Sequence, residues 1–332
     1  MMSGKGKLMS MIVVFVLVAS IGIAAAAEKP KDYPKRPIEV VVPYGAGGGS
    51  DLFARSSCMM ARRYMKNSIV IINKPGAGGV VGFEYVQNQP ADGYTILATS
   101  LSTMVTGGLV GMTKYQLADF HPIMRAQHDT LALEVLPGGK YKTIQDVIAD
   151  AKARPGKQSW VQVGSATGLV AMAMQQFIDA MGIDVKVISY NSAGKQHAAL
   201  LGGHVDVIAE EPGPIAGLLE AGKMKMVVVF AKERLKAFPD VPTTKELGAN
   251  AFMGVYRGVA VKKGTPQPIS DYLHAIFKKS VESKYYKNYE KSSYLDLRPG
   301  YLGPEDFKTF LEGEAAFFTK EYKRMGLYKI KK

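Results

Sequence analysis

Two glycine-rich turns near the start of this 332-residue chain constrain its fold more than any other feature. The first turn spans residues 45–49 and directly follows a β-branched run at 38–42. The second spans residues 76–79 and follows a similar run at 68–73. Each turn leads into a segment with helical periodicity. The chain therefore repeats one unit, in which a strand passes through a glycine turn into a helix.

This repeated unit predicts an anion site. Parallel strands that are joined through helices place their carboxyl ends, and thus both turns, at one edge of the sheet. A glycine turn before a helix exposes backbone N–H groups at the positive end of the helix dipole. Ser50 or Asp51 is suited to cap the first helix, expected at 52–66, and the second helix is expected at about 80–87. We expect one small anion to be held between the two turns.

The rest of the chain predicts a two-lobed α/β protein, in which each lobe is a mostly parallel sheet flanked by helices. Strands are expected at 94–99, 123–126, 131–135, 160–163, 185–190, 205–209 and 224–230, and helices at 143–153, at 193–201, at 215–220 and up to residue 181. A further strand at 255–261 has no partner left in the second unit, so the chain is expected to return to the first. Two long helices, at 268–283 and 304–325, follow it. These patterns predict a first lobe at 28–126 plus 252–332, a second lobe at 127–251, and two hinge segments.

The amino terminus has the organisation of a signal peptide. Lys5 and Lys7 precede an apolar run at 11–27, and Ala25-x-Ala27 fits a cleavage site just before Glu28. An uncleaved membrane anchor is the alternative, because the run is close to the minimum length that spans a bilayer. The alanine-rich end favours cleavage. We therefore expect residues 1–27 to be removed and the mature protein to be periplasmic.

Composition and motif searches exclude several classes of function. The lysines behind the formal charge of +13 are scattered, with modest concentrations at 278–291 and 320–332, and they form no aromatic-basic platform or nucleic-acid signature, so no nucleic-acid partner is expected. Gly45-x-Gly47-x-x-Ser50 lacks the third glycine of a dinucleotide site, and no acidic residue follows at the required distance. The five histidines are dispersed and are expected at the surface or the hinge. The sequence thus predicts no cofactor, no metal site, no catalytic residues and no enzymatic activity.

Eight motifs along the chain match a known family. The chain resembles the Bug family, the periplasmic solute receptors of tripartite tricarboxylate transporters, over essentially the whole mature sequence. The matching motifs are Tyr33-Pro34-x-Arg36-Pro37-Ile38, Val42-Pro43-Tyr44-x-Ala46-Gly47-Gly48-x-x-Asp51, Asn73-Lys74-Pro75-Gly76-Ala77-Gly78-Gly79, Asp92-Gly93-Tyr94-Thr95, Leu200-Leu201-Gly202-Gly203-x-Val205-Asp206, Ala221-Gly222-Lys223, Phe238-Pro239-Asp240-Val241-Pro242-Thr243 and Gly264-Thr265-Pro266.

The resemblance implies a class II-like periplasmic binding fold that captures a small organic carboxylate in the cleft between the lobes. It also implies delivery of the ligand to integral-membrane transporter subunits, and we expect a monomer. The ligand-binding residues are then Tyr44, Ala46, Gly47 and Gly48 in the first turn, Gly76, Ala77, Gly78, Gly79 and Val80 in the second, and Ser100, Ser165, Thr167, Asn191, Glu210 and Glu211 elsewhere. Asp51 is expected to cap the helix that shapes the first turn.

The sequence departs from the usual family pattern in the second lobe. Asn191 stands where the family commonly has a lysine, and Glu210-Glu211 stands where an Asp-Asn pair is common. We hypothesise that the distal end of the ligand is neutral, hydroxylated or cationic and contacts Glu210 or Glu211. The alternative is that both glutamates are solvated or paired with a lysine. Two other functions also stay open, a sensor or scavenger that presents its ligand to a signalling partner, and an enzyme on the same scaffold.

Overall fold

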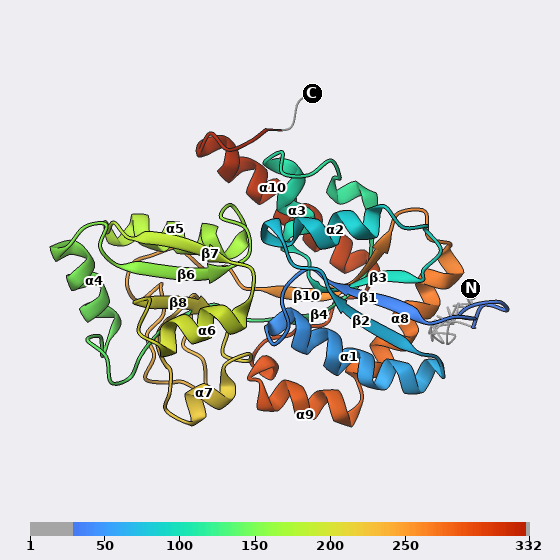
Figure 1. Ribbon diagram of the computed structural model, residues 1–332, viewed down its shortest axis with the longest axis horizontal. Coiled ribbons are helices and arrows are strands. Elements are labelled where there is room, and N and C mark those ends of the chain that lie inside the picture. Colours follow the sequence, from blue (N-terminus) through green and yellow to red (C-terminus); the bar gives the residue numbers. More distant parts are fainter. Residues whose placement is uncertain (1–28, 330–332) are drawn as a thin grey trace, which may run out of the picture.

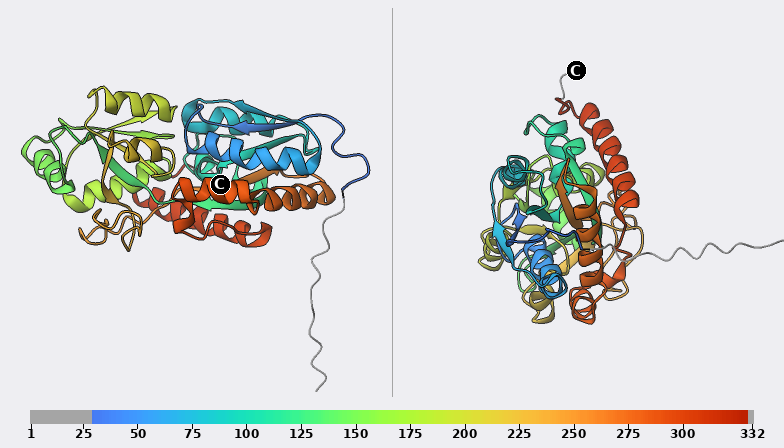
Figure 2. Two further views of the ribbon diagram at one scale, coloured as in Figure 1. Left: turned by 90° about the horizontal axis from the view of Figure 1, so that it is seen from below. Right: turned by 90° about the vertical axis from the view of Figure 1, so that its right-hand side faces the viewer.

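The computed structural model describes residues 29–329, which form two α/β lobes lying side by side (Figure 1). The predicted signal peptide at 1–27 lies outside the described residues. Each lobe contains one five-stranded sheet. We call the lobe with the first sheet lobe 1 and the other lobe 2; Figure 2 shows both from two further directions.

The sheet of lobe 1 has the strand order β2-β1-β3-β10-β4. Its β1–β2 and β1–β3 pairings are parallel, whereas β10 is antiparallel to both of its neighbours. Four of the five strands therefore point the same way, in a mixed sheet. The strands are β1 (Ile38–Val42), β2 (Ile69–Asn73), β3 (Thr95–Ser100), β4 (Phe120–His128) and β10 (Tyr256–Lys262).

The sheet of lobe 2 repeats this arrangement with the order β7-β6-β8-β5-β9. The β6–β7 and β6–β8 pairings are parallel, and β5 is antiparallel to β8 and β9. The strands are β5 (Ala132–Val135), β6 (Ser159–Val163), β7 (Lys186–Tyr190), β8 (Val207–Glu210) and β9 (Lys225–Val229). Both lobes thus place the ends of their parallel strands at equivalent edges.

Helices cover both faces of each sheet because successive side chains of a buried strand point to opposite faces. In β1, Val40 packs with α1 and α8, while Val41 packs with α2, α3 and α10. The helices of lobe 1 are α1 (Gly49–Met65), α2 (Val80–Gln87), α3 (Ser102–Leu109), α8 (Gln267–Val281), α9 (Lys284–Ser292) and α10 (Pro304–Arg324). Those of lobe 2 are α4 (Ile144–Ala153), α5 (Leu169–Met181), α6 (Ala193–Leu201) and α7 (Ala216–Glu220).

The predicted elements agree with these bounds except in a few places. β4 begins at Phe120, three residues before the prediction, and includes Pro122. Proline is tolerated there because β4 is an edge strand. Helices α3 and α9 were not predicted; the amino terminus of α9 is capped by Ser283. Within residues 29–329, no helix combines the length and the apolar character needed to cross a bilayer.

Two segments connect the lobes. The outgoing segment is short, because β4 ends at His128 and β5 begins at Ala132 in the other sheet. The returning segment leads into β10, which pairs with β3 and β4 in the first sheet. The prediction that the chain returns to lobe 1 is therefore confirmed. The proposed boundaries at 126 and 252 stay a prediction, and β4 continues two residues beyond the first of them.

Candidate functional site

A cavity of about 70 Å³ lies between the lobes, where strands of both sheets end. Six predicted site residues line it. They are Tyr44, Gly48 and Ser100 from lobe 1 and Ser165, Glu210 and Glu211 from lobe 2. They lie at or just after the ends of β1, β3, β6 and β8. Both lobes therefore contribute predicted residues to this cavity.

The amino termini of four helices also meet at this cavity. Gly49 begins α1, Ser102 begins α3, Leu169 begins α5, and Ala193 begins α6; all four residues line the cavity. Helix amino termini carry unpaired N–H groups and the positive end of the helix dipole. The cavity wall therefore favours a negatively charged group, and both lobes contribute to this preference.

The first glycine turn is held by Asp51, although not as predicted. Helix α1 begins at Gly49, and the residue at its N-cap position is Gly48, so neither Ser50 nor Asp51 is the N-cap. The Asp51 carboxylate instead accepts a hydrogen bond from the Gly47 N–H at 3.0 Å. It is also bonded by Arg55 at 2.8 Å and by Asn73 at 3.0 Å. Burial raises the pKa of Asp51, but these three hydrogen bonds outweigh it and the net shift is downward.

The same turn touches lobe 2 at the start of α6. The Gly45 N–H donates a hydrogen bond to the backbone carbonyl of Asn191 at 3.2 Å. A Cβ atom on Gly45 would lie 2.8 Å from the Ser192 Cβ, which explains why glycine is needed here. The side chain of Asn191 is exposed, and Asn191 does not line the cavity. Ala46 and Gly47 are also exposed and outside it.

The second glycine turn contacts lobe 2 rather than the cavity. None of the residues 76–80 lines the cavity. Gly78 has φ +65°, and a Cβ there would lie 2.5 Å from the Cα of Ser165. The turn is joined to the cavity by Thr103, whose hydroxyl donates to the Gly78 carbonyl at 3.1 Å and lies 3.0 Å from the Tyr44 hydroxyl. This turn thus acts as a contact surface between the two lobes.

Ser165 and Thr167 strengthen that contact from lobe 2. Their hydroxyls lie 3.0 Å apart and both reach the sulfur of Met112, which belongs to lobe 1. The Tyr322 hydroxyl on α10 donates to the Thr167 carbonyl. Ser165 is buried and lines the cavity, whereas Thr167 lies beside it. The two lobes are therefore packed together in this structure.

The sequence analysis missed Arg257, a cavity-lining arginine on β10. Its Nη2 lies 2.8 Å from the Glu211 carboxylate, and its Nη1 lies 3.9 Å from that of Asp129. All three side chains are about 95% buried. Burial lowers the pKa of Arg257, but Glu211 and Asp129 raise it, and the net shift is upward. Arg257 is thus a buried cation that joins the two lobes.

The other carboxyl groups of lobe 2 outnumber the cations near them. Glu210 accepts a hydrogen bond from Gln196 and lies 3.1 Å from Nε2 of His197. Burial raises the pKa of Glu210, but His197, Glu211 and Arg257 together outweigh it, and the net shift is downward. Glu134 is fully buried and neither of its carboxyl oxygens has a hydrogen-bond partner. We call the group of Asp129, Glu134, Glu210, Glu211 and Arg257 the cleft cluster.

The pKa shifts reflect this excess of carboxyl groups. Burial and the charges of Glu210 and Glu211 raise the pKa of Glu134. Burial raises the pKa of Glu211, Arg257 opposes the shift, and Glu210 and Asp129 add to it. Burial also raises the pKa of Asp129 to about 7, against the effect of Arg257. The alternative that both glutamates are solvated or paired with a lysine is wrong, because both are buried and lie beside His197 and Arg257. Of the histidines expected at the surface or the hinge, His197 has a side chain that is only 13% exposed.

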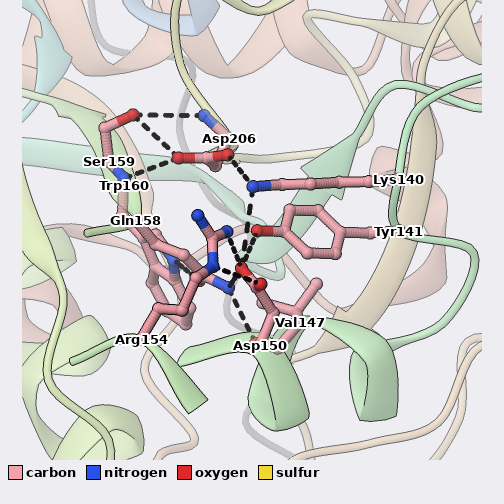
Figure 3. A network of polar contacts seen from close by, with 9 residues as sticks. All are labelled: Lys140, Tyr141, Val147, Asp150, Arg154, Gln158, Ser159, Trp160 and Asp206. Atoms are coloured by element: carbon pink, nitrogen blue, oxygen red, sulfur yellow. Dashed lines mark hydrogen bonds and ion pairs between the residues drawn. The ribbon is translucent and has the colours of Figure 1, made fainter. Parts of the chain in front are cut away.

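A second group of carboxylates, the distal cluster, lies elsewhere in lobe 2 (Figure 3). It consists of Asp150 and Asp206 together with Lys140, Tyr141, Arg154, Gln158 and Ser159. Asp150 is bonded by Tyr141, Arg154 and Gln158. Asp206 is bonded by the Ser159 N–H and hydroxyl and lies 2.9 Å from Lys140. These contacts fasten α4 to the start of β6. Among residues 29–329, no group of three or more His, Cys, Asp or Glu is arranged to hold a metal ion.

The fold and the cleft define a two-lobed binding protein with its site between the lobes, and comparisons with known proteins agree. A family model described as "Tripartite tricarboxylate transporter family receptor" matches residues 53–313. The chain therefore belongs to this family of solute-binding receptors, and the predicted resemblance is confirmed. It is 30% identical to the protein BugT of Bordetella pertussis over 284 residues, which cover 84% of this chain and 85% of BugT.

Solved structures show the same fold. The periplasmic binding protein BugD matches with a TM-score of 0.80 at 26% identity, covering 90% of this chain and 100% of BugD. An R. palustris protein solved with adipate matches equally well, with a TM-score of 0.80, 26% identity and the same shares of the two chains. The predicted two-lobed periplasmic-binding-protein fold is confirmed.

Proposed function

We propose that this protein is a periplasmic receptor that binds a small organic carboxylate between its lobes and delivers it to integral-membrane transporter subunits. The observation that carries this proposal is the cavity at which four helix amino termini from both lobes meet beside Arg257. Such a wall stabilises a carboxylate without a metal ion. Membership of the receptor family and the adipate in a related structure support the same ligand class.

The first glycine turn and the second have different parts in this proposal. Tyr44, Gly48, Ser100 and Ser165 line the cavity and contact the carboxylate. The second turn binds lobe 2 through Gly78 and Ser165, and so stabilises the closed arrangement of the lobes. Closure excludes water and strengthens the polar contacts to the ligand.

The proposal includes the cellular setting predicted from the sequence. Residues 1–27 are a signal peptide cleaved near Ala27/Glu28, and the mature chain is a monomer without enzymatic activity. Residues 28–126 plus 252–332 move against residues 127–251 about the two connecting segments. Such hinge closure around a ligand is a common way for two-lobed proteins to bind small molecules.

A thermal-shift screen of mono-, di- and tricarboxylates tests the ligand class. A ligand that saturates the protein at 100 times its dissociation constant adds about 2.7 kcal/mol to the free energy of unfolding. At least one carboxylate is expected to raise the melting temperature. If none does, the protein is not a carboxylate receptor.

The Gly78→Ala variant tests the role of closure. The added Cβ would collide with the Ser165 backbone, so the lobes are held apart and affinity for the ligand should fall by at least about tenfold, or about 1.4 kcal/mol. Gly203→Ala is the matched control, because Gly203 has φ +68° and no neighbour within 4 Å of the added atom. Equal affinities for the two variants would contradict a role for this contact.

A further inference from the structure

Among the described residues that line the cavity, the charged ones are Arg257, Glu210 and Glu211, and Arg257 and Glu211 form an ion pair across the two lobes. Arg257 comes from β10 in lobe 1, and Glu211 directly follows β8 in lobe 2. Their Nη2 and Oε2 atoms are 2.8 Å apart, and the side chains are 4% and 5% exposed. Both residues line the cavity. A ligand that enters between the lobes therefore has to separate this pair or bind directly beside it.

The Arg257 guanidinium has hydrogen-bonding capacity to spare. Its Nε is buried without a partner, and its Nη1 lies 3.5 Å from the Gln127 side-chain oxygen. Gly49 lets the guanidinium lie against the start of α1, since a Cβ there would be 2.1 Å from Nη2. Of the described residues that line the cavity, Arg257 alone carries a positive charge. It is therefore the side chain that a ligand carboxylate would bind.

Lobe 2 offers the opposite chemistry. Glu210 and Glu211 line the cavity, and the unpartnered carboxyl of Glu134 lies behind them on β5. Arg257 donates to the Glu211 carboxylate at 2.8 Å, and the Glu211 backbone N–H donates to the Glu210 carboxylate at 3.3 Å. Among the described residues, this side of the cavity has no lining cation for a second carboxylate of the ligand. It presents carboxyl groups that an ammonium group would satisfy.

Charge balance then discriminates between ligand classes. A ligand with carboxylates alone adds negative charge to a buried group that already has too few cations. If it takes Arg257, Glu211 loses its partner, and breaking a buried ion pair by removing one side is strongly unfavourable. A zwitterion adds no net charge and supplies a new partner to each member of the pair.

We propose that the ligand is a small amino carboxylate that inserts between Arg257 and Glu211. Its carboxylate binds the Arg257 guanidinium and the helix amino termini, and its ammonium group binds Glu211, with Glu210 beside it. This inference rests on the proposed function and narrows its ligand class. The same pair that joins the two lobes thereby becomes the element that selects the ligand.

Calorimetric titration with matched ligands tests this selection. Succinate is compared with aspartate, glutarate with glutamate, and butyrate with γ-aminobutyrate, because each second ligand carries an ammonium group that the first lacks. The best amino carboxylate is expected to bind at least about tenfold more tightly than its match. Equal or tighter binding of the ligands without an ammonium group overturns this inference and leaves the carboxylate receptor intact. Binding of neither kind, nor of any carboxylate in the wider screen, overturns both.

Variants of Glu211 identify the group that binds the ammonium. Glu211→Gln keeps the size of the side chain and removes its charge, so the preference for the amino carboxylate should fall at least about tenfold. Glu233→Gln is the matched control, because Glu233 is exposed in the same lobe. Glu211→Asp keeps the charge and is expected to retain the preference, which separates loss of charge from loss of folding. An unchanged preference in Glu211→Gln overturns the assignment.

Discussion

The two carboxylate clusters of lobe 2 differ in how completely their charges are paired. In the distal cluster every oxygen of Asp150 and Asp206 has a partner, and Lys140 and Arg154 lie half-exposed around them. In the cleft cluster Arg257 is the cation for two buried carboxyl groups, those of Glu211 and Asp129, and neither carboxyl oxygen of Glu134 has a hydrogen-bond partner. The first arrangement fastens elements of the fold. The second arrangement leaves carboxyl groups without enough cations, so a ligand can supply the missing partner.

The pKa values of the distal carboxyl groups are lowered, whereas those of the cleft carboxyl groups are raised except for Glu210, which lies beside His197. Hydrogen bonds from Arg154 and Tyr141 hold the pKa of Asp150 below its ordinary value. Burial raises the pKa values of Glu134 and Glu211 above theirs. A carboxylate surrounded by donors is stabilised in its charged form, whereas one buried among other carboxyls is not. Substitutions in the two clusters should therefore have effects of different size.

The largest effect is expected for Arg257→Gln. This change removes the cation from a buried pair, so the free energy of unfolding should fall by about 3–5 kcal/mol at neutral pH. Urea unfolding of the variant and the wild type measures the difference. The double variant Arg257→Gln/Glu211→Gln should recover part of the loss, because it leaves no unpaired Glu211. A loss below about 1 kcal/mol would mean that the pair contributes no more than a surface contact.

The next largest effect is expected for Asp129→Asn, which should change the pH dependence of the free energy of unfolding. Because the pKa of Asp129 is raised from 3.8 to about 7, the folded protein holds a proton that the unfolded chain releases. The contribution of Asp129 to the free energy of unfolding is full below about pH 4 and is lost as the pH rises through about 7. The free energy then falls by up to about 1.4 kcal/mol per pH unit.

Replacing Asp129 by asparagine should reduce this slope between pH 5 and 7, as measured by urea unfolding at three or more pH values. Asp150→Asn is the control. Because the pKa of Asp150 in the wild type is lowered, its carboxylate contributes stability that is lost only as the pH falls below the ordinary value of 3.8. The slope between pH 5 and 7 should therefore not change in this variant. Identical slopes for Asp129→Asn and the wild type would contradict the raised pKa.

The smallest effect is expected for Lys140→Met in the distal cluster. Lys140 is half-exposed and bridges Asp150 at 3.6 Å and Asp206 at 2.9 Å. Exposed ion pairs contribute about 0–1 kcal/mol, so unfolding should change by no more than that. Ligand affinity, measured by calorimetry, should stay the same. A change in affinity would show that the distal cluster influences the cleft.

Local sequence patterns predicted much of this fold. Thr143 stands at the start of the helix predicted at 143–153, and it caps α4 in the structure. Its hydroxyl accepts a hydrogen bond from the Asp146 N–H at 3.2 Å. The bounds of α2 and α6 agree with the prediction residue for residue. Helix α9 was missed because its lysine- and tyrosine-rich sequence is polar on average and contains no aliphatic residue. It buries only Tyr286 and Glu290.

The site was predicted only in part. The glycine turns and Glu210-Glu211 stand out in the sequence, the first by composition and the second by departure from the family pattern. Arg257 does not, because a single arginine within the apolar run of β10 is compatible with an exposed edge position. Its burial follows from its neighbours in space, Glu211 and Asp129, which are far away along the chain.

The sequence by itself determined the strands, the glycine turns, most of the helices and the family, because these depend on local periodicity, turn chemistry and motif order. Only the tertiary structure decided that the second turn contacts Ser165 instead of lining the cavity, and that Arg257 faces Glu211 across the lobes. The physical reason is that desolvation and charge pairing depend on which residues meet in space. In this protein those residues come from different lobes, and the packing of the lobes brings them together.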